Sequence, residues 1–396
     1  MVKINHIIER EYISRGKLRD LLSSCYQCVG CSSICQMGRV QDYTPSKIIQ
    51  LIIEGFEEQV ISSGIFWDCL TCNSCLQLCP YNINFSEIVR DARKEMIERG
   101  IEPNIAHKGF YTLISEIMSK ENITPNRTFE WIPPECDITD RGEILYFVGC
   151  TPFFDFEFPG FSNIAIDSLK ILCKIEKKPI VVLRDEICCG HDLLWQGKIE
   201  TFKKLAKKNI KAFKKSNASV IITSCAEGYR TLKIDYPNLC DDFNIKIKHL
   251  IEYIYEKLIE NKITFKNIDD STNNINLTFH DPCRLSRFLP NSSELCEMVR
   301  YIFEKLREIG YNFQEMDHNK TNSICCGVSC WLNCSDKTKA LRIERMKEAK
   351  KIADNLITIC PKCELHFKCT QNDSKKFKNL KISDFSNLLI KVIDFK

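Results

Sequence analysis

The stretch that organises this chain runs from residue 280 to residue 363. It opens with His280-Asp281-Pro282-Cys283, passes through Cys325-Cys326-Gly327 and closes on Cys360-Pro361-Lys362-Cys363. Five cysteines therefore come from three separate pieces of sequence. A tetrahedral metal ion takes four ligands, and so does an ordinary cubane iron–sulfur cluster. Adjacent cysteine side chains diverge too much to chelate one small ion, so the pattern favours a larger cluster that accepts sulfur on two irons.

The same order of features occurs earlier in the chain, at a separation of about 135 residues. Each copy has a strand-like run that ends in a cysteine, then a Cys-Cys-Gly triplet, then a second strand-like run that ends in a cysteine. In the first copy these are residues 144–148 before Cys150, Cys188-Cys189-Gly190, and residues 220–224 before Cys225. In the second copy they are residues 275–279 before Cys283, Cys325-Cys326-Gly327, and residues 356–359 before Cys360. Three matches near one offset predict a duplicated domain.

Helical patterns separate the strand-like runs in both copies. They cover residues 164–174 and 202–215 in the first copy, and residues 294–309 and 338–354 in the second. Alternation of strands and helices predicts an α/β domain with a parallel sheet. Ligands of such sheets bind beyond the carboxyl ends of the strands, where the cysteines that follow the strands are expected to meet.

The two copies differ in their cysteines. The second copy has Cys283, Cys325, Cys326, Cys360 and Cys363. The first copy has Cys150, Cys188, Cys189 and Cys225, and Gly228 stands where the fifth cysteine belongs. Three outcomes are open for the first copy: an altered or cubane cluster on four thiolates, replacement of the missing ligand by Cys240 or Cys173, or an empty structural site. We favour the retained but altered cluster.

Two further cysteine runs lie near the N-terminus, and both have the spacing C-x2-C-x2-C-x3-C. They consist of Cys25, Cys28, Cys31 and Cys35, and of Cys69, Cys72, Cys75 and Cys79. In two-cluster ferredoxins with this spacing, the fourth cysteine of each run binds the other cluster. One [4Fe-4S] cubane is then expected on Cys25, Cys28, Cys31 and Cys79, and the other on Cys69, Cys72, Cys75 and Cys35. The alternative is a pair of structural zinc sites. Zinc sites usually have paired Cys-x-x-Cys motifs, and this spacing differs from that pattern.

The helical signals around these runs exceed those of a minimal ferredoxin. Thr44 and Pro45 are suited to begin a helix, and residues 85–99 carry an apolar helical stripe that ends at Gly100. The N-terminal region is therefore expected to be an α-helical ferredoxin domain.

Composition supports a metalloprotein. The chain has 24 cysteines among 396 residues, 56 basic and 52 acidic residues, and a net charge of +4. This near-balance gives no support for binding nucleic acid. Disulfide scaffolds are usually small and secreted, whereas this chain is large and begins with a charged, helical pattern, so we expect a reducing, cytoplasmic location. No apolar run approaches the ~20 residues that span a bilayer, and any membrane association is expected to be peripheral, through a partner.

These observations predict a multidomain α+β protein. An α-helical two-cluster ferredoxin domain occupies residues 1–100, and a linker with Pro103, Pro125, Pro133 and Pro134 covers residues 101–140. The first α/β copy covers residues 141–266 and the second covers residues 275–396, with residues 267–274 as the connector.

The order of these modules resembles the D-type subunits of heterodisulfide reductases, which fuse the separate C-type and B-type subunits and contain CCG cysteine-rich domains. The resemblance is carried by Cys25-Tyr26-Gln27-Cys28, by Ile222-Thr223-Ser224-Cys225 and by His280-Asp281-Pro282-Cys283. It implies a non-cubane [4Fe-4S] cluster on the five cysteines of the second copy, which are then the catalytic residues of an oxidoreductase. It also implies a disulfide as the substrate, in that family the mixed disulfide of coenzyme M and coenzyme B, with electrons supplied through the two cubanes.

The resemblance leaves an alternative open. The C-type subunit of anaerobic glycerol-3-phosphate dehydrogenase and the iron–sulfur subunit of glycolate oxidase are similar, and they carry electrons from a flavoprotein toward quinone. The implied partner is accordingly a membrane cytochrome b or a flavoprotein, and Gly228 departs from the pattern of a cluster in each copy.

Other residues near the motifs have open roles. His191, His280 and His366 either donate protons to a leaving thiolate or pack behind the ligands. Cys330, Cys334, Cys296 and Cys369 are expected to be buried thiols outside the sites. Gly327 is expected to let the backbone approach the cluster closely.

Overall fold

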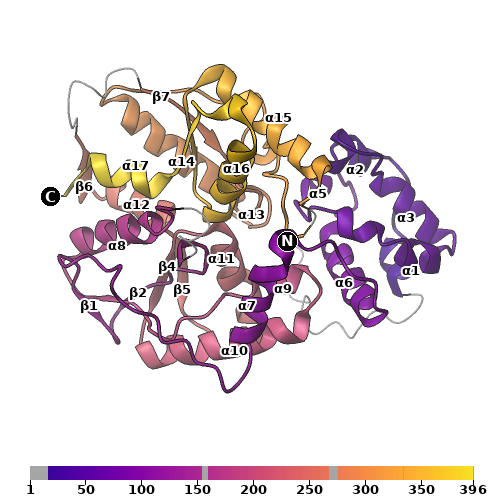
Figure 1. Cartoon of the computed structure of the whole chain (residues 1–396), viewed down its shortest axis with the longest axis horizontal. Helices are drawn as coiled ribbons and strands as arrows, with labels where there is room; N and C mark the ends of the chain where they lie inside the picture. The colour runs from indigo at the N-terminus through magenta and orange to yellow at the C-terminus, as the bar shows by residue number, and fades with distance from the viewer. Residues whose placement is uncertain (1–16, 154–158, 267–274, 333, 396) are drawn as a thin grey trace.

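The computed structural model describes residues 17–153, 159–266, 275–332 and 334–395. Figure 1 shows the N-terminal helices gathered at one end of the molecule, beside two α/β units that lie against each other. The expected connector at residues 267–274 lies outside the described residues. The predicted fold class, a helical ferredoxin region followed by two α/β copies, is confirmed.

The N-terminal region consists of helices of modest length. Thr44 is extended and Pro45 occupies the first turn of the helix that follows it, as expected from the fixed φ of proline. The Asn84 side chain accepts a hydrogen bond from the Glu87 amide at 3.4 Å and so caps another helix. The helices are α1 (Lys17–Leu22), α2 (Gly30–Ser33), α3 (Pro45–Ile53), α4 (Glu57–Ser62), α5 (Ser74–Gln77) and α6 (Phe85–Glu98).

The first copy contains a five-stranded parallel sheet with the order β1-β3-β2-β4-β5. Its strands are β1 (Ile138–Thr139), β2 (Ile144–Tyr146), β3 (Ile180–Val181), β4 (Val220–Thr223) and β5 (Lys246–His249). Its helices are α8 (Asn163–Glu176), α9 (His191–Trp195), α10 (Ile199–Ser216), α11 (Ala226–Arg230) and α12 (Leu250–Ile259). The preceding segment, residues 101–140, contributes α7 (Phe110–Met118) as well as the edge strand β1.

The second copy contains a four-stranded parallel sheet with the order β10-β9-β7-β8. Its strands are β7 (Ile275–His280), β8 (Tyr311–Phe313), β9 (Asn355–Thr358) and β10 (Lys381–Asp384). Its helices are α13 (Cys283–Ser286), α14 (Ser292–Arg307), α15 (Asp336–Ile352), α16 (Pro361–Asp373) and α17 (Phe385–Val392). Strands β8, β7, β9 and β10 take the places that β3, β2, β4 and β5 take in the first copy, so the predicted repeat is present in the fold.

The two copies pack reciprocally. Helix α12 of the first copy packs on α14 of the second, and α17 of the second packs on α8 of the first. Helices α12 and α17 occupy equivalent positions in the two copies, as do α8 and α14, so one contact is made twice, as in an isologous dimer. The equivalent strands β6 (Ile263–Phe265) and β11 (Ile393–Phe395) pair antiparallel with each other. The copies are therefore related by an approximate twofold axis.

The N-terminal domain docks on the first copy through a close backbone contact. The buried Arg93 of α6 donates from Nη1 to the Trp195 carbonyl at 2.8 Å. Gly197 follows at φ +89°, and a Cβ atom there would lie 2.5 Å from the Lys94 backbone nitrogen. Only glycine fits this contact.

Among the described residues, no helix is both long and apolar enough to cross a bilayer.

Substitution of Gly197 should loosen the docking of the ferredoxin domain. In Gly197→Ala the added methyl group meets backbone atoms that cannot move aside, at a cost of about 1–3 kcal/mol beyond backbone strain. The matched control is Gly100→Ala, because Gly100 also has a positive φ, +74°, but has nothing within 4 Å of the added atom. Each kcal/mol of lost stability should lower the apparent melting temperature of the holoprotein by roughly 2 °C. We therefore expect a lower melting temperature for Gly197→Ala than for Gly100→Ala. Equal melting temperatures would contradict the contact.

Candidate functional site

The eight cysteines of the N-terminal runs line two cavities. One cavity, of about 340 Å³, is lined by Cys35, Cys69, Cys72 and Cys75. The other, of about 390 Å³, is lined by Cys25, Cys28, Cys31 and Cys79, and Cys75 reaches this cavity as well. These are the two sets of four that the spacing predicts. We call them the inner set and the outer set, respectively.

Burial shapes the chemistry of the inner set. Desolvation raises the pKa of Cys35 to about 12 and that of Cys69 to about 11. Thiols of this kind stay protonated at neutral pH unless a bound metal displaces the proton. The donor type and the number of thiols therefore fit an iron–sulfur cubane in each set.

The two sets differ in their surroundings. Cys28 of the outer set is exposed, and so are the large apolar side chains beside it, which are Tyr26, Val29, Leu78 and Tyr81. The inner set faces the second copy. The outer set is thus the one that a partner can approach.

Two buried arginines join the loop that contains Thr71 and Cys72, here called the inner loop, to the second copy. Arg284 donates from Nη1 to the Thr71 carbonyl at 2.8 Å, and Arg287 donates from Nε to the Cys72 carbonyl at 2.7 Å. In addition, the Cys325 amide donates to the Gln36 side chain at 3.4 Å. The inner set therefore lies directly beside the cysteines of the second copy.

The five cysteines of the second copy come together at the carboxyl edge of its sheet. Cys283 begins α13, Cys360 is the N-cap of α16, and Cys363 lies in the first turn of α16. Each thiol affects the pKa of the next in the order Cys283, Cys325, Cys326, Cys363, Cys360, so the five thiols lie side by side. This donor set fits a cluster that needs more than four thiolates.

The thiols of this series have unequal acidities. Hydrogen bonds from Cys325 and then Cys363 lower the pKa of Cys326 to about 5. Hydrogen bonds from Cys225 and Cys363 lower the pKa of Cys360. The neighbouring thiols thus favour the thiolate form at Cys326 and Cys360, and thiolate is the form that binds iron.

Local contacts explain the two motifs that carry these cysteines. The Asp281 carboxylate is held by the Arg300 guanidinium and by the Lys320 amide at 2.8 Å, which fixes the chain before Cys283. Gly327 has φ +79°, and a Cβ atom there would lie 2.6 Å from the Thr338 carbonyl of α15. Glycine is therefore required here by the contact with α15, and the expected close approach of Gly327 to the cluster stays a prediction.

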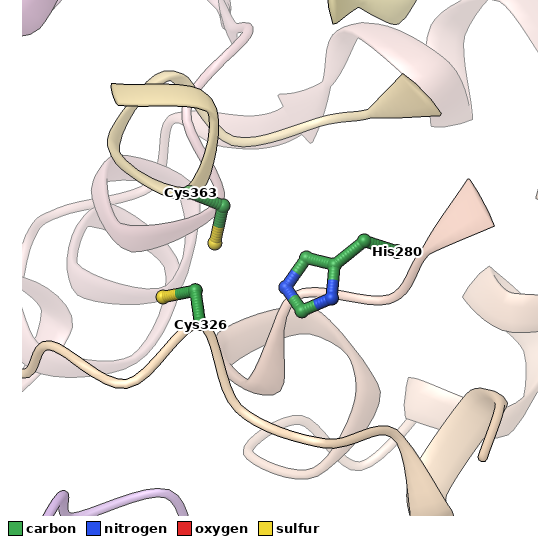
Figure 2. A group of neighbouring side chains, drawn as sticks. All are labelled: His280, Cys326 and Cys363. Atoms are coloured by element: carbon green, nitrogen blue, oxygen red, sulfur yellow. The ribbon is translucent and has the colours of Figure 1, made fainter. Parts of the chain in front are cut away.

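Two histidines lie at the second-copy site. Nδ1 of His366 is 3.5 Å from Sγ of Cys326. A ring nitrogen of His280 and the sulfurs of Cys326 and Cys363 all lie within 4.8 Å of one another, and Figure 2 shows the ring facing the two thiols. Burial lowers the pKa of both histidines, which favours the neutral form of each ring. The third histidine, His191, lies in the first copy, where it bonds Thr231 and Arg284.

The cysteines of the first copy divide between two places. Cys150, Cys188 and Cys189 form a hydrogen-bonded series. The Cys225 thiol instead has its pKa raised mainly by the neighbouring thiol of Cys360 in the second copy. The fourth thiol of the first copy therefore stands at the boundary between the two sites.

The expected replacements for the missing fifth cysteine lie elsewhere. The Cys240 thiol bonds Asp242 at 2.8 Å beside Lys214 at the end of α10, and Cys173 bonds Cys136 near the end of α8. In a parallel sheet, each helix ends at the amino edge, where the next strand begins. Cys240 and Cys173 therefore lie at the amino edge of the sheet. Of the three open outcomes, the structure therefore does not support replacement of the missing ligand by Cys240 or Cys173.

A buried lysine from the second copy enters the first-copy site. The Lys362 ammonium pairs with Asp192 and, at 2.8 Å, with Glu227. Glu227 and Lys362 are equivalent residues of the two copies, as are Cys225 and Cys360, so like positions meet on the approximate twofold axis. Sequence reasoning missed this network. Its only local signal is a lysine inside the Cys-Pro-Lys-Cys motif.

The remaining cysteines agree only in part with expectation. Cys330 and Cys296 are buried, as predicted, and Cys369 is half-buried. Cys334 is exposed, which corrects the prediction of burial.

Comparison with known proteins agrees with this arrangement. The CCG cysteine-rich domain family matches residues 144–233 and 277–368, and the 4Fe-4S dicluster domain family matches residues 21–83. The D-type subunit of dihydromethanophenazine:CoB–CoM heterodisulfide reductase from Methanosarcina acetivorans is 28% identical over 81% of this chain and 75% of its own length.

Two other relatives are more distant. The B-type subunit of fumarate reductase (CoM/CoB) from Methanothermobacter marburgensis is 25% identical, over 92% of this chain and 70% of its own length. The EtfAB:quinone oxidoreductase of Syntrophomonas wolfei is 22% identical, over 85% of this chain and 47% of its own length. The chain therefore belongs to the iron–sulfur proteins that join a 4Fe-4S dicluster domain to two CCG cysteine-rich domains, and it is homologous to the D-type subunit of heterodisulfide reductase.

Proposed function

We propose that this iron–sulfur electron-transfer protein takes electrons in at the outer set, passes them through the inner set and uses them at the second-copy site to reduce a disulfide. The observation that carries the proposal is the contact between the inner loop and the complete five-cysteine site, made by Arg284, Arg287 and Gln36. Homology to the D-type subunit of heterodisulfide reductase supports the same direction of electron flow.

The ligand assignments are supported by the two cavities that the ferredoxin cysteines line. We assign one [4Fe-4S] cubane to Cys25, Cys28, Cys31 and Cys79 and the other to Cys35, Cys69, Cys72 and Cys75. The first lies beside exposed Cys28 and receives electrons from a partner protein, either a cytochrome b or a flavoprotein. The second lies beside Cys325 and delivers electrons to the catalytic site.

The second-copy cysteines would hold a non-cubane [4Fe-4S] cluster. Such a cluster supplies one-electron steps, and two of them, with two protons, convert one disulfide to two thiols. Cys283, Cys325, Cys326, Cys360 and Cys363 bind it. Cys325, Cys326, Cys360 and Cys363 are buried, so the surrounding protein excludes most water from the reacting sulfur.

For the first copy we propose an altered cluster on its four remaining cysteines. Cys150, Cys188 and Cys189 contact one another, and Cys225 stands next to Cys360. Gly228 offers no thiolate, and the ammonium of Lys362 lies near this place. The first copy thus differs from the second in both ligand number and charge.

Because thiolate-bound iron requires reducing conditions, we propose a cytoplasmic location.

Iron content tests the ligand assignment. Three clusters contain about 12 irons and four contain about 16, at four irons each. Cys326→Ser should lose about four irons and leave the spectra of the two ferredoxin cubanes unchanged. The matched control is Cys330→Ser, because Cys330 is also a buried thiol near the site, and it should keep the full iron content. Equal loss in both variants would contradict the assignment.

Disulfide-dependent turnover tests the reaction. With a reduced viologen dye as donor, the anaerobic protein should oxidise the dye when the mixed disulfide of coenzyme B and coenzyme M is added. Cys326→Ser should lose at least about a hundredfold in rate, because it removes a ligand of the catalytic group. Cys330→Ser should stay near the parent rate.

If the dye reduces the cubanes but added disulfide causes no turnover, this proposal is wrong. That result would point to an electron carrier that serves a flavoprotein. Glutathione disulfide, assayed in parallel, would show whether the site selects among disulfides.

A further inference from the structure

His280 presents an unpaired ring nitrogen to the second-copy site. The residue is the last of β7, its side chain is buried, and its exposed fraction is 1%. Nε2, the nitrogen remote from Cβ, faces the sulfurs of Cys326 and Cys363 (Figure 2). Within the described part of the chain, Nε2 has no hydrogen-bond partner. An unpaired polar atom in so buried a position indicates a ligand that occupies the site.

The other ring nitrogen decides what Nε2 can do. Arg345 donates from Nε to Nδ1 of His280 at 3.2 Å. A guanidinium has only donors, so Nδ1 must offer its lone pair. Because an accepting Nδ1 has no proton, the N–H of the ring is on Nε2. A protonated Nε2 has no lone pair for iron, so His280 is a hydrogen-bond donor and not a metal ligand.

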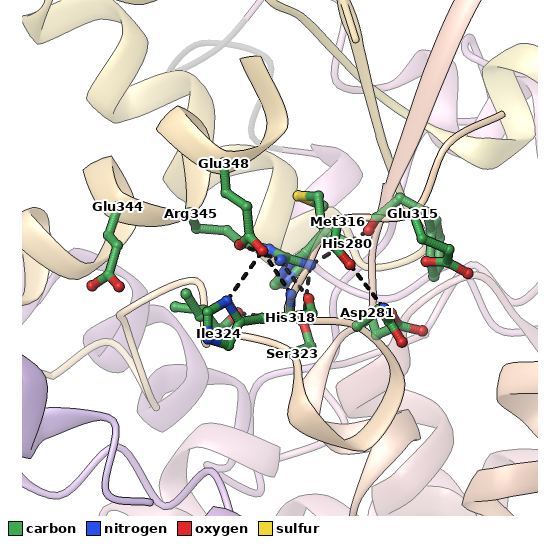
Figure 3. Close-up of polar contacts among 12 residues, drawn as sticks. His280, Asp281, Glu315, Met316, His318, Ser323, Ile324, Glu344, Arg345 and Glu348 are labelled. Atoms are coloured by element: carbon green, nitrogen blue, oxygen red, sulfur yellow. Dashed lines mark hydrogen bonds and ion pairs between the residues drawn. The ribbon is translucent and has the colours of Figure 1, made fainter. Parts of the chain in front are cut away.

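The guanidinium that fixes this tautomer cannot turn away. It also donates to the His318 carbonyl at 2.6 Å, to Glu348 at 2.8 Å and to the Ser323 hydroxyl at 3.1 Å. Figure 3 shows this network around the histidine ring. The ring of Phe367 lies edge-on to His280, with 4.9 Å between centroids. Both the orientation and the tautomer of His280 are therefore fixed by the fold.

The first copy lacks this arrangement. His280 precedes Cys283 by three residues, and the residue that precedes Cys150 by three is Phe147. Phe147 is fully buried and has no polar atom in its side chain. The donor is thus confined to the copy that has all five cysteines.

We propose that His280 donates an Nε2–H hydrogen bond to a sulfur of the cluster held by Cys326 and Cys363, and that Arg345 is the positioning residue that makes it a donor. The proposal rests on the proposed second-copy cluster but not on its disulfide chemistry. Hydrogen bonds to cluster sulfurs favour the more negative, reduced state and so raise the reduction potential. The device would make the second-copy cluster a better electron acceptor for the inner cubane.

A redox titration followed by EPR tests the effect on potential. In His280→Leu, we expect the ratio of reduced to oxidised second-copy cluster at a fixed potential to fall about tenfold, which corresponds to about 59 mV for one electron. The ferredoxin cubanes should not shift. His280→Gln keeps an N–H donor and should restore most of the ratio. The matched control is His318→Leu, because His318 contacts Glu348 of the same network but is half-exposed.

Pulsed EPR on wild-type protein with ¹⁵N-labelled histidine supplies a readout that needs no variant. The proposal predicts a weak nitrogen coupling and an exchangeable proton near the second-copy cluster. Arg345→Met removes the donor to Nδ1, frees the tautomer and should produce the strong coupling of a directly bound nitrogen.

Three outcomes would count against these ideas in different ways. A directly bound nitrogen in the wild type, or an unshifted potential in His280→Leu with full iron content, would overturn the role of His280 alone. Iron confined to the two ferredoxin cubanes would overturn both this role and the proposed catalytic cluster.

Discussion

Two buried guanidinium groups connect the three parts of this protein. Arg284 and Arg287 follow Cys283 closely in the chain, and both reach across to backbone carbonyls of the inner ferredoxin loop. Arg284 also donates to His191 of the first copy at 3.0 Å. Burying a cation is costly unless its donors are satisfied. Every acceptor of Arg284 belongs to another domain, whereas Arg287 divides its donors between the Cys72 carbonyl and two carbonyls of its own copy. Arg284 therefore loses most of its acceptors if the ferredoxin domain moves away, so the distance between the inner set and the cysteines of the second copy is part of the folded state.

The duplication gives a symmetric framework with unequal sites. The sheets have the same strand order, and the helices that join the copies occur as equivalent pairs. On the axis, however, Glu227 pairs with Lys362, and Gly228 is the equivalent of Cys363 in the sequence. Phe147 stands at the position that His280 occupies in the second copy. The first copy has therefore kept its packing surfaces while its site has changed in charge and in ligand number.

Much of this arrangement is predictable from local patterns. The C-x2-C-x2-C-x3-C runs specify which thiols face one cavity, because such short loops leave few conformations. Strand-like runs that end in cysteine place Cys150, Cys225, Cys283 and Cys360 at the carboxyl edges of parallel sheets. Both predictions depend only on neighbouring residues and on the general topology of α/β folds.

The contacts between copies could not be predicted in this way. Lys362 enters the first-copy site, and Cys225 lies beside Cys360, only because of the angle at which the two copies pack. Arg345 reaches His280 from a helix 65 residues further along the chain. No periodicity in the sequence marks such pairs. The exposure of Cys334, contrary to the expected burial, is a matter of the same long-range packing.

The pairing of β6 with β11 has a consequence for cooperativity. Strand β6 follows the last helix of the first copy, yet its hydrogen-bond partner is supplied by the second copy. Together with the helix pairs α12–α14 and α8–α17, this places much of the apolar surface of each copy against the other. Neither copy then forms a foldon of its own, and the two should open as one unit in native-state hydrogen exchange. Loss of the first copy would expose the apolar surface of the second copy that packs against it. Selection would therefore retain the first copy even though its site has one cysteine fewer.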